Sequence, residues 1–351
     1  MSALEELLKE AATIDAADIF ILPGTQVTCK ANGQMHTLGD EKLMPDSAEK
    51  LISEIYELSG RGVDRLKQTG DDDFSFALPG LSRFRVNTYK QRGSLAAVIR
   101  VIKFGIPSYR EIGIPDAVMS VASKTKGLIL VTGPAGSGKS TTLACIIDKI
   151  NETREGHIIT LEEPIEFLHR NKKSIVSQRE VELDTVNYVT ALRACLRQSP
   201  DVILVGEMRD YETIQTAMTA AETGHLVIST LHTVGAANTI DRIIDVFPPA
   251  QQQQIRIQIS MLLQAVVSQQ LIPTSEGGLT PAFELMFLTN AIRNVIREAK
   301  IHQIDSIIST SAAAGMISMD TSLVKLLNDG KINMETAQRY AVNPDMLQKR
   351  I

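Results

Sequence analysis

The chain has 351 residues, of which 44% are hydrophobic and 22% are charged, and its formal net charge is −5. This length predicts two domains, and the composition is that of an ordinary globular protein. The negative charge gives no electrostatic case for binding nucleic acid over the whole surface. No apolar run reaches the roughly 18 residues that span a membrane, and the acidic start of the chain does not predict a signal peptide. Cys29, Cys145 and Cys195 are scattered among apolar neighbours, which predicts core thiols in a reducing compartment rather than a zinc site.

The first hundred residues predict a small α+β unit, an antiparallel sheet with helices on one side. The expected helices are 3–12 and 45–59, and the expected strands are 18–22, 27–30, 34–38, 73–78, 83–89 and 95–102. Asn32-Gly33 is a strong signal for a hairpin turn between two of these strands. Residues 103–115 contain two prolines and two glycines, which predicts an ordered connector with limited hinge motion.

From residue 116 onward, apolar strands alternate with helices, the pattern of a doubly wound α/β core. The expected strands are 128–132, 157–161, 174–177, 202–205, 226–230 and 282–287. Several are continuous apolar runs, as expected for strands covered on both faces. Four glutamines, 251–254, precede Ile255, Ile259, Leu262 and Val266 at helical spacing, which predicts one helix through this stretch. The tail from about residue 291 is predicted to be helical.

A phosphate-binding loop follows the first of these strands. Residues 133–140 read G-x-x-x-x-G-K-S, between the apolar run 128–131 and a predicted helix. Its glycines let backbone N–H groups face phosphate oxygens, and the helix N-terminus adds positive charge. Lys139 is expected to reach the β- and γ-phosphates, and Ser140 to hold Mg²⁺. The predicted nucleotide-binding residues are Gly133, Pro134, Ala135, Gly136, Ser137, Gly138, Lys139, Ser140 and Thr141.

Carboxylates follow two later strands. Glu207 ends the apolar strand that starts after Asp201. Many ATPases with a phosphate-binding loop have an aspartate at the position of Gly206. Glu207 is therefore predicted to act on Mg²⁺ or on the attacking water. Glu162 and Glu163 follow another strand. The carboxyl ends of such strands converge on the ligand crevice of an open α/β sheet. Solvated surface carboxylates are the alternative interpretation both for Glu207 and for the pair Glu162 and Glu163.

Two histidines, His225 and His232, bracket a third strand. Seven positions apart, they point to opposite faces and lie at opposite ends of the strand, which excludes one shared metal ion. His232 is at the carboxyl end, where the γ-phosphate is expected. A purely structural histidine is the alternative for either residue.

Arginines on the strands of the N-terminal unit suggest a nucleotide site shared between the two domains. Arg83 and Arg85 share a face of one strand because side chains alternate, and Arg100 lies on the next. Arginine suits bidentate phosphate contacts. The alternative is that these arginines are merely solvated.

Residues 289–298 predict a packed surface helix. Thr289-Asn290 is the expected N-cap. The apolar stripe is Ile292, Val295, Ile296 and Ala299, and the residues on other faces are Arg293, Arg297 and Glu298.

Together these segments resemble the secretion/pilus motor ATPases, and most closely the family of type IV pilus retraction ATPases (PilT family). The matching motifs, in the family's order, are residues 16–20, the Arg-Phe-Arg-Val-Asn strand 83–87, the phosphate-binding or Walker A loop 133–140, the "Asp box" 160–167, the Walker B strand 200–210, the "His box" 223–233 and the retraction signature 291–298. The chain departs from the family's pattern at Phe20, Ala135, Glu163 and Val295.

The resemblance implies a PAS-like domain at 1–102, a linker at 103–115, and a RecA-like P-loop ATPase domain with a helical tail at 116–351. It implies a homohexameric ring that uses ATP and Mg²⁺ to power pilus retraction and twitching motility. Its expected location is cytoplasmic, at the inner face of the cytoplasmic membrane at the pilus base. The expected partners are an inner-membrane platform protein and a paralogous retraction ATPase, with no nucleic acid.

The same resemblance implies roles for individual residues. Glu162 and Glu207 position water and Mg²⁺, with Glu163 as a neighbour and Glu162 preferred as the base. Ser140 and Glu207 are the implied metal-binding residues, and His225 and His232 hold or sense the γ-phosphate. Arg83, Arg85 and Arg100 complete the site from the N-terminal domain. The implied retraction helix is Ala291, Ile292, Arg293, Asn294, Val295, Ile296, Arg297 and Glu298.

Three other functions fit parts of the pattern. A pilus extension or type II secretion assembly ATPase is expected to be longer and to carry a four-cysteine zinc element. A non-hydrolysing partner ring would bind ATP without needing intact acids and histidines. A nucleic-acid translocase on the same fold would need a basic, aromatic groove.

Overall fold

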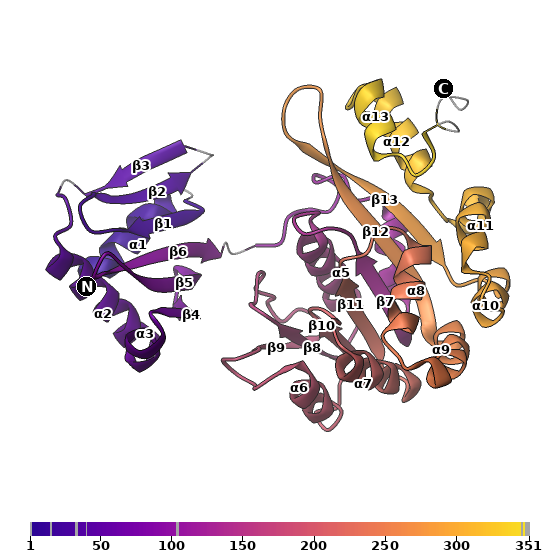
Figure 1. Ribbon diagram of the computed structural model, residues 1–351, viewed down its shortest axis with the longest axis horizontal. Coiled ribbons are helices and arrows are strands. Elements are labelled where there is room, and N and C mark those ends of the chain that lie inside the picture. The colour runs from indigo at the N-terminus through magenta and orange to yellow at the C-terminus, as the bar shows by residue number, and fades with distance from the viewer. Residues whose placement is uncertain are drawn as a thin grey trace. The chain divides into compact units, whose positions relative to one another are not determined.

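The computed structural model describes residues 2–14, 16–31, 34–39, 41–102, 105–344 and 347. The chain divides into two compact units, Met1–Gly105 and Ile106–Ile351 (Figure 1). The predicted hairpin turn at Asn32-Gly33 lies outside the described residues. Within the described residues, no helix combines the length and the hydropathy that a membrane crossing requires.

The first unit is built on a six-stranded antiparallel sheet in the order β3-β2-β1-β6-β5-β4. Its helices and strands agree closely with those expected from the sequence, and the short helix α3 is an addition. The elements are α1 (Ala3–Thr13), β1 (Asp18–Ile21), β2 (Val27–Ala31), β3 (Gln34–Leu38), α2 (Pro45–Ser59), α3 (Asp64–Thr69), β4 (Asp71–Leu78), β5 (Ser82–Gln91) and β6 (Ser94–Ile102).

The helices of this unit pack against one face of the sheet. Along β5, buried residues alternate with half-buried ones, so that Phe84 and Val86 point into the core and Arg83 and Arg85 point away from it. The three helices supply apolar residues to the same core, for example Leu8, which is completely buried. The first unit is therefore an α+β unit, as predicted.

The second unit is an α/β fold around a seven-stranded sheet in the order β13-β12-β7-β11-β10-β8-β9. All neighbours pair in parallel except β12 and β13. The elements up to β11 are α4 (Asp116–Met119), η1 (Ser120–Ser123), β7 (Gly127–Thr132), α5 (Lys139–Thr153), β8 (His157–Glu162), β9 (Ile175–Glu180), α6 (Tyr188–Cys195), β10 (Val202–Val205), α7 (Tyr211–Glu222) and β11 (Leu226–Leu231). The later elements are α8 (Ala236–Asp245), α9 (Pro249–Leu262), β12 (Leu263–Pro273), β13 (Leu279–Phe287), α10 (Asn290–Arg297), η2 (Ile301–Gln303), α11 (Ile304–Thr310), η3 (Ala312–Ala314), α12 (Met319–Asn328) and α13 (Met334–Tyr340).

Helices cover both faces of this sheet, as the apolar strands predict. Leu128 and Leu130 of β7 contribute to the core shared with α6 to α11, whereas Ile129 and Val131 contribute to the core shared with α4 and α5. All six residues of β7 are buried. A strand with both faces buried needs apolar residues at every position, which is why β7 reads as a continuous apolar run.

The predicted helix through the glutamines is confirmed as far as Leu262 and is wrong beyond that residue. The helix α9 ends at Leu262, and β12 begins at Leu263, so Val266 is a strand residue paired with Leu130 of β7. The helical spacing of the apolar residues continues past the point where the chain turns into the sheet. Burial beside β7 therefore overrides the local pattern.

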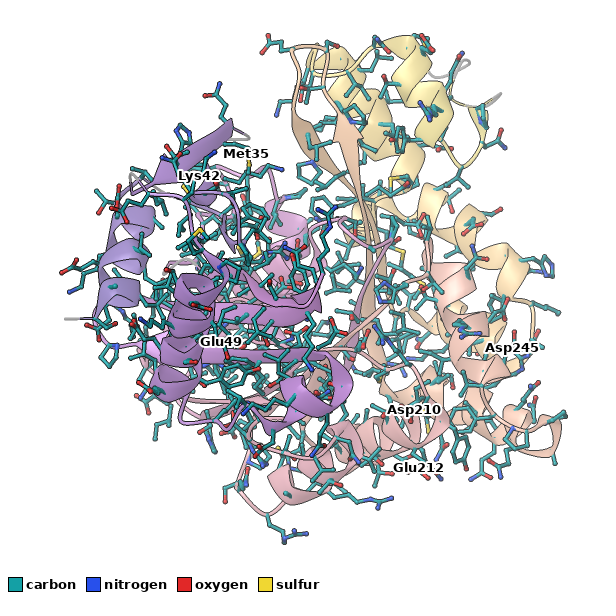
Figure 2. All side chains as sticks on the ribbon, turned by 60° about the vertical axis from the view of Figure 1, so that its left-hand side comes forward. Met35, Lys42, Glu49, Asp210, Glu212 and Asp245 are labelled. Carbon is teal, nitrogen blue, oxygen red and sulfur yellow. The ribbon has the colours of Figure 1, made fainter. Side chains whose placement is uncertain are left out.

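The connector and the helix ends follow their local signals. Residues 105–115 contain no helix or strand, and Ile114 is buried against the core beside α5. The helix α7 begins after Asp210, whose carboxylate accepts a hydrogen bond from the backbone N of Thr213 at 2.9 Å. Glu212 adds negative charge to the first turn at the same end of that helix (Figure 2).

The helix α10 starts as predicted and ends earlier than its apolar stripe suggests. The side chain of Thr289 accepts a hydrogen bond from the backbone N of Ile292, and the residues Ile292, Val295 and Ile296 are buried. Ala299, predicted to belong to the stripe, is exposed with φ +58°, two residues beyond the last helical residue. The chain has already left the helix there, so Ala299 cannot pack with it.

Candidate functional site

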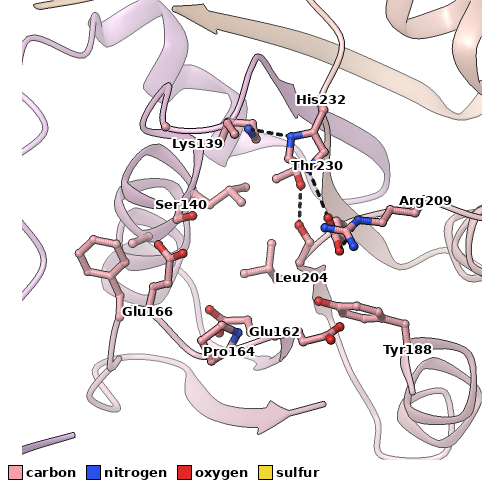
Figure 3. A pocket seen from close by; sticks show the side chains of 18 of the residues that line it. Lys139, Ser140, Glu162, Pro164, Glu166, Tyr188, Leu204, Arg209, Thr230 and His232 are labelled. Atoms are coloured by element: carbon pink, nitrogen blue, oxygen red, sulfur yellow. Dashed lines mark hydrogen bonds and ion pairs between the residues drawn. The ribbon is translucent and has the colours of Figure 1, made fainter. Parts of the chain in front are cut away.

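A pocket of about 270 Å³ opens at the carboxyl edge of the parallel strands in the second unit (Figure 3). The strands β8, β10 and β11 run in the same direction, so the residues that follow them meet at one edge. The lining residues are Ala135, Gly136, Lys139, Ser140, Leu143, Ala144, Glu162, Glu163, Pro164, Glu166, Phe167, His169, Tyr188, Leu204, Gly206, Glu207, Arg209, Thr230 and His232. The fold thus brings together the phosphate loop, the three predicted acids Glu162, Glu163 and Glu207, and His232.

The phosphate loop is packed closely against β12. A Cβ on Gly133 would lie 2.1 Å from the backbone O of Gln269, so only glycine fits there. Gly138 has φ +86° and directly precedes Lys139, the first residue of α5. The Oγ of Ser137 is buried without a hydrogen-bond partner among the described residues. A buried, unpaired hydroxyl in a glycine-rich loop at a helix N-terminus fits the binding of a phosphate group.

The ammonium group of Lys139 closes back onto its own loop. Its Nζ donates to the backbone O of Gly133 at 2.8 Å and to that of Pro134 at 2.9 Å, and lies 3.5 Å from Nδ1 of His232. Burial lowers the pKa of Lys139, while the negative charges of Glu207 and Glu166 oppose this. A partly desolvated cation attracts an anionic ligand more strongly than a hydrated one does.

Glu207 lies beyond the end of β10, between two basic side chains. Its Oε1 is 2.7 Å from Nε of Arg209, and its Oε2 is 3.4 Å from Nε2 of His232. The two ring nitrogens of His232 therefore face Lys139 on one side and Glu207 on the other (Figure 3). The expectation that His232 follows the carboxyl end of its strand is confirmed, because β11 ends at Leu231.

Glu162 and Glu163 are in different environments although they are adjacent. Oε1 of Glu162 accepts hydrogen bonds from Oγ1 of Thr160 at 2.6 Å and from Nε2 of Gln178 at 3.2 Å. Burial of this carboxyl group raises the pKa of Glu162 to about 7, although part of the residue faces the pocket. Glu163 is exposed and is joined to Pro164 by a cis peptide bond. A carboxyl group that titrates near neutral pH is suited to accept a proton from water.

His225 lies at the amino end of β11 and does not line this pocket. Its Nδ1 is 3.0 Å from the backbone O of Ala220 and 3.0 Å from Oγ1 of Thr223. The strand between the two histidines spans six residues, roughly 20 Å at the usual rise. Within this pocket, His225 is therefore not placed to contact a γ-phosphate, and any such role stays a prediction.

The three predicted arginines lie on one face of the sheet in the first unit. Arg85 and Arg100 are directly opposite each other on β5 and β6, and Arg83 is two residues from Arg85. Arg85 makes a two-point contact with Asp73, with distances of 3.2 and 2.9 Å, and Nε of Arg100 is 2.9 Å from Oδ1 of Asp18. The shared face is confirmed, and the role of these residues in a nucleotide site stays a prediction.

A second pocket, of about 440 Å³, lies on the other side of the phosphate loop and was missed by sequence reasoning. It is bounded by the connector, the start of α5, and the strands β12 and β13. Its lining residues are Glu111, Ile112, Gly113, Ile114, Gly138, Thr141, Thr142, Gln269, Leu271, Leu279, Thr280, Pro281 and Lys331. The mistaken helix across residues 263–266 hid the strand that forms one wall. The adjacent β-branched residues Val266 and Val267 were the available signal.

Several residues of the first pocket carry no motif that identifies them in the sequence. Tyr188, the first residue of α6, is the clearest example. Burial, followed by the charges of Glu163, Glu207 and Glu162, raises its pKa, so its phenol stays neutral. Arg209 belongs to the Walker B segment, and its position beside Glu207 could have been suspected from that segment.

Comparison with known proteins agrees with this geometry. The family model described as "Type II/IV secretion system protein" matches residues 1–278. "Twitching motility protein" of Neisseria gonorrhoeae is 44% identical over 319 residues, which are 91% of this chain and 85% of that protein. "Type IV pilus retractation ATPase PilT" of Pseudomonas aeruginosa is 43% identical over 342 residues, 97% of this chain and 99% of that protein. A solved structure, "Crystal Structure of the Pilus Retraction Motor PilT and Bound ADP", matches with a TM-score of 0.91 and 45% identity over 99% of both chains.

Proposed function

This chain belongs to the type II/IV secretion system protein family, among its PilT-type ATPases, and from this we propose that it is a motor that hydrolyses ATP to power retraction of a type IV pilus. The single observation that carries the proposal is the first pocket. It unites Lys139 of the phosphate loop, Glu207 after β10, His232 after β11 and Glu162 of β8. The similar proteins are named for pilus retraction and twitching motility, which supports retraction as the task of this motor.

Each residue of the pocket has its own role in ATP hydrolysis. Lys139 exchanges the carbonyl oxygens of Gly133 and Pro134 for the β- and γ-phosphates. Glu162, in its ionised form, accepts a proton from the attacking water. His232 lies between Lys139 and Glu207, where it contacts the γ-phosphate and senses its loss. Ser140 and Glu207 would hold Mg²⁺, which would neutralise phosphate charge.

The second pocket supplies room for the base and ribose of the nucleotide. It adjoins Gly138 and Thr141, so it continues from the phosphate loop on the side opposite the acids. Its apolar walls include Ile114 and Leu271, which suit the faces of a purine ring. The similar solved structure contains bound ADP, which supports nucleotide binding by this fold.

We further infer that the second unit is RecA-like, that the first is PAS-like, and that six copies form a ring. The antiparallel sheet with helices on one face supports the assignment of the first unit. Arg83, Arg85 and Arg100 then complete the site from a first unit, and hydrolysis moves the units relative to one another. The ring acts in the cytoplasm, at the membrane base of the pilus, on an inner-membrane platform protein, with a paralogous ATPase as a further partner.

Two substitutions test the hydrolysis. Lys139→Ala removes the phosphate-binding cation, and Glu207→Ala removes the acid at the end of β10. Each variant is expected to lose at least about 100-fold in kcat, measured as phosphate release with ATP and Mg²⁺. The matched control is Lys126→Ala, because Lys126 is an exposed lysine at the opposite end of β7. Normal turnover by the Glu207→Ala protein would contradict the role given to this acid.

Retraction itself is tested by deleting the gene from a piliated host. The deletion strain is expected to assemble pili that do not retract, and the Lys126→Ala protein is expected to restore retraction. Loss of pili on deletion would instead indicate an extension motor.

A further inference from the structure

Gly206 leaves space that is filled by a hydroxyl group from another element. A Cβ on Gly206 would lie 2.8 Å from Oη of Tyr188, 3.2 Å from the backbone O of Leu161 and 3.5 Å from Cα of Glu162. The φ angle of Gly206 is not in the left-handed region, so its backbone does not require glycine. The tightest obstacle to a side chain at 206 is therefore the hydroxyl of Tyr188.

Tyr188 is held firmly in this place. It is the first residue of α6, and the preceding N-cap, Asn187, accepts a hydrogen bond from the backbone N of Thr190 at 2.8 Å. The ring packs against the apolar core, and its hydroxyl points into the nucleotide pocket (Figure 3). The position of Oη is therefore set by α6 and by the core, and not by flexible loop residues.

The hydroxyl faces the acidic end of the pocket. The charges of Glu163, Glu207 and Glu162 raise the pKa of this phenol, and the charge of Arg209 opposes them. Within the described parts of the chain, no group makes a hydrogen bond with Oη of Tyr188. A neutral phenol among carboxylates can donate its proton to a carboxylate oxygen or to a water molecule between them.

We propose that Tyr188 is a positioning residue for ATP hydrolysis. Its Oη stands where the side chain of residue 206 would otherwise be, and it donates a hydrogen bond to the water held between Glu162 and Glu207. This inference rests on the proposed ATPase activity. The phenol orients the water that Glu162 deprotonates, and the glycine at 206 is required because the hydroxyl occupies its space.

The first test removes only the hydroxyl. Tyr188→Phe is expected to lower kcat for ATP hydrolysis about tenfold, the effect of one lost hydrogen bond in the transition state. KM for ATP and the affinity for a non-hydrolysable ATP analogue are expected to stay unchanged, because the hydroxyl acts on water and not on the nucleotide. The matched control is Tyr211→Phe on α7, whose Oη donates to Oε1 of Gln251 at 3.2 Å outside this pocket.

The second test adds a methyl group at residue 206, which faces the hydroxyl of Tyr188. Gly206→Ala is expected to lower kcat at least as much, because the new Cβ displaces Oη. In the Tyr188→Phe background the same substitution is expected to have a much smaller further effect, since the obstacle is gone. Gly206→Ala also keeps the whole ring, so it tests the hydroxyl even if Tyr188→Phe unfolds the protein.

Wild-type kcat in either single variant overturns the inference, as does a loss of analogue affinity that matches the loss of kcat. Equal effects of Gly206→Ala in both backgrounds also overturn it, because the methyl group would then act through Leu161 and not through the hydroxyl. If the wild-type protein itself released no phosphate, the proposed function would fail and the role of Tyr188 would fail with it. The unmutated protein in the same assay therefore separates the two cases.

Discussion

At the scale of single residues, Glu162 combines a buried carboxyl group with two hydrogen-bond donors, Thr160 and Gln178. Burial raises its pKa to about 7, whereas the hydrogen bonds act in the opposite direction. The group must be ionised to accept a proton from water. The ATPase rate of the wild-type protein is therefore expected to rise with pH through about 7, in a profile of kcat against pH.

Glu162→Gln is expected to abolish this rise of kcat with pH, which we call the pH-dependent limb, together with most of the activity. The matched variant Glu163→Gln is expected to keep the limb, because Glu163 is exposed. Loss of the limb in the Glu163→Gln protein, and not in the Glu162→Gln protein, would assign the base to Glu163.

The same pKa has a consequence for stability, with a defined sign. A carboxyl group whose folded-state pKa is raised stabilises the fold when it is protonated, and this contribution is lost as the pH rises to about 7. Glu162→Gln is therefore expected to raise the free energy of unfolding at pH 8. The gain is expected to shrink as the pH falls toward the ordinary value of 4.5.

At the scale of elements, the helix α10 carries two arginines whose side chains have different environments. Nη1 of Arg293 donates to the backbone O of Ser260 at 2.6 Å, near the end of α9, whereas the guanidinium group of Arg297 is exposed and contacts only Asn294 of its own helix among the described side chains. Helix C-termini have carbonyl groups without helical partners, and Arg293 donates to two of them, those of Ser260 and Met261.

Arg293→Ala is expected to lower the free energy of unfolding by about 1–2 kcal/mol, measured by denaturant titration. Arg297→Ala is expected to leave stability and ATPase activity unchanged and to fail to restore retraction in the deletion strain. Rescue of retraction by the Arg297→Ala protein would indicate that this helix has only a packing role.

The strand β12 shows where local pattern and fold disagree. Ile255, Ile259 and Leu262 follow the helical period, and α9 contains all three. The chain then enters the sheet between β7 and β13, where Val266 and Val267 are completely buried on opposite faces. Which neighbours are available for pairing is a property of the whole sheet, so a window of a few residues could not reveal it.

At the scale of the whole molecule, the chain holds its predicted phosphate-binding residues in two separate units. Arg85 is neutralised by Asp73 within its own unit, with a bidentate geometry that a phosphate group can also accept. The proposed shared site requires Arg85 to exchange this partner for the nucleotide during the cycle.

Arg85→Ala is expected to lower kcat at least about tenfold in the assembled protein, with phosphate release as the measurement. The control is Lys90→Ala, which removes a positive charge near the far end of the same strand, where Nζ of Lys90 bonds the backbone O of Lys67. Equal turnover in the two variants would contradict a site completed by the first unit.

By itself, the sequence determined the phosphate loop, the acids at Glu162 and Glu207, and the strand end at His232. These follow from short-range rules, because loop glycines, strand runs and helix starts are set by neighbouring residues. It also determined that Arg83 and Arg85 share a face, which follows from the alternation of side chains.

Only the tertiary structure decided which of these groups share a pocket. The parallel strands carry Glu162, Glu207 and His232 to one edge, and the same direction carries His225 to the other end. Only folding places Oη of Tyr188 against Gly206 and Gln269 of β12 against the phosphate loop. Both contacts join residues distant in the chain, and their geometry depends on packing that no local pattern encodes.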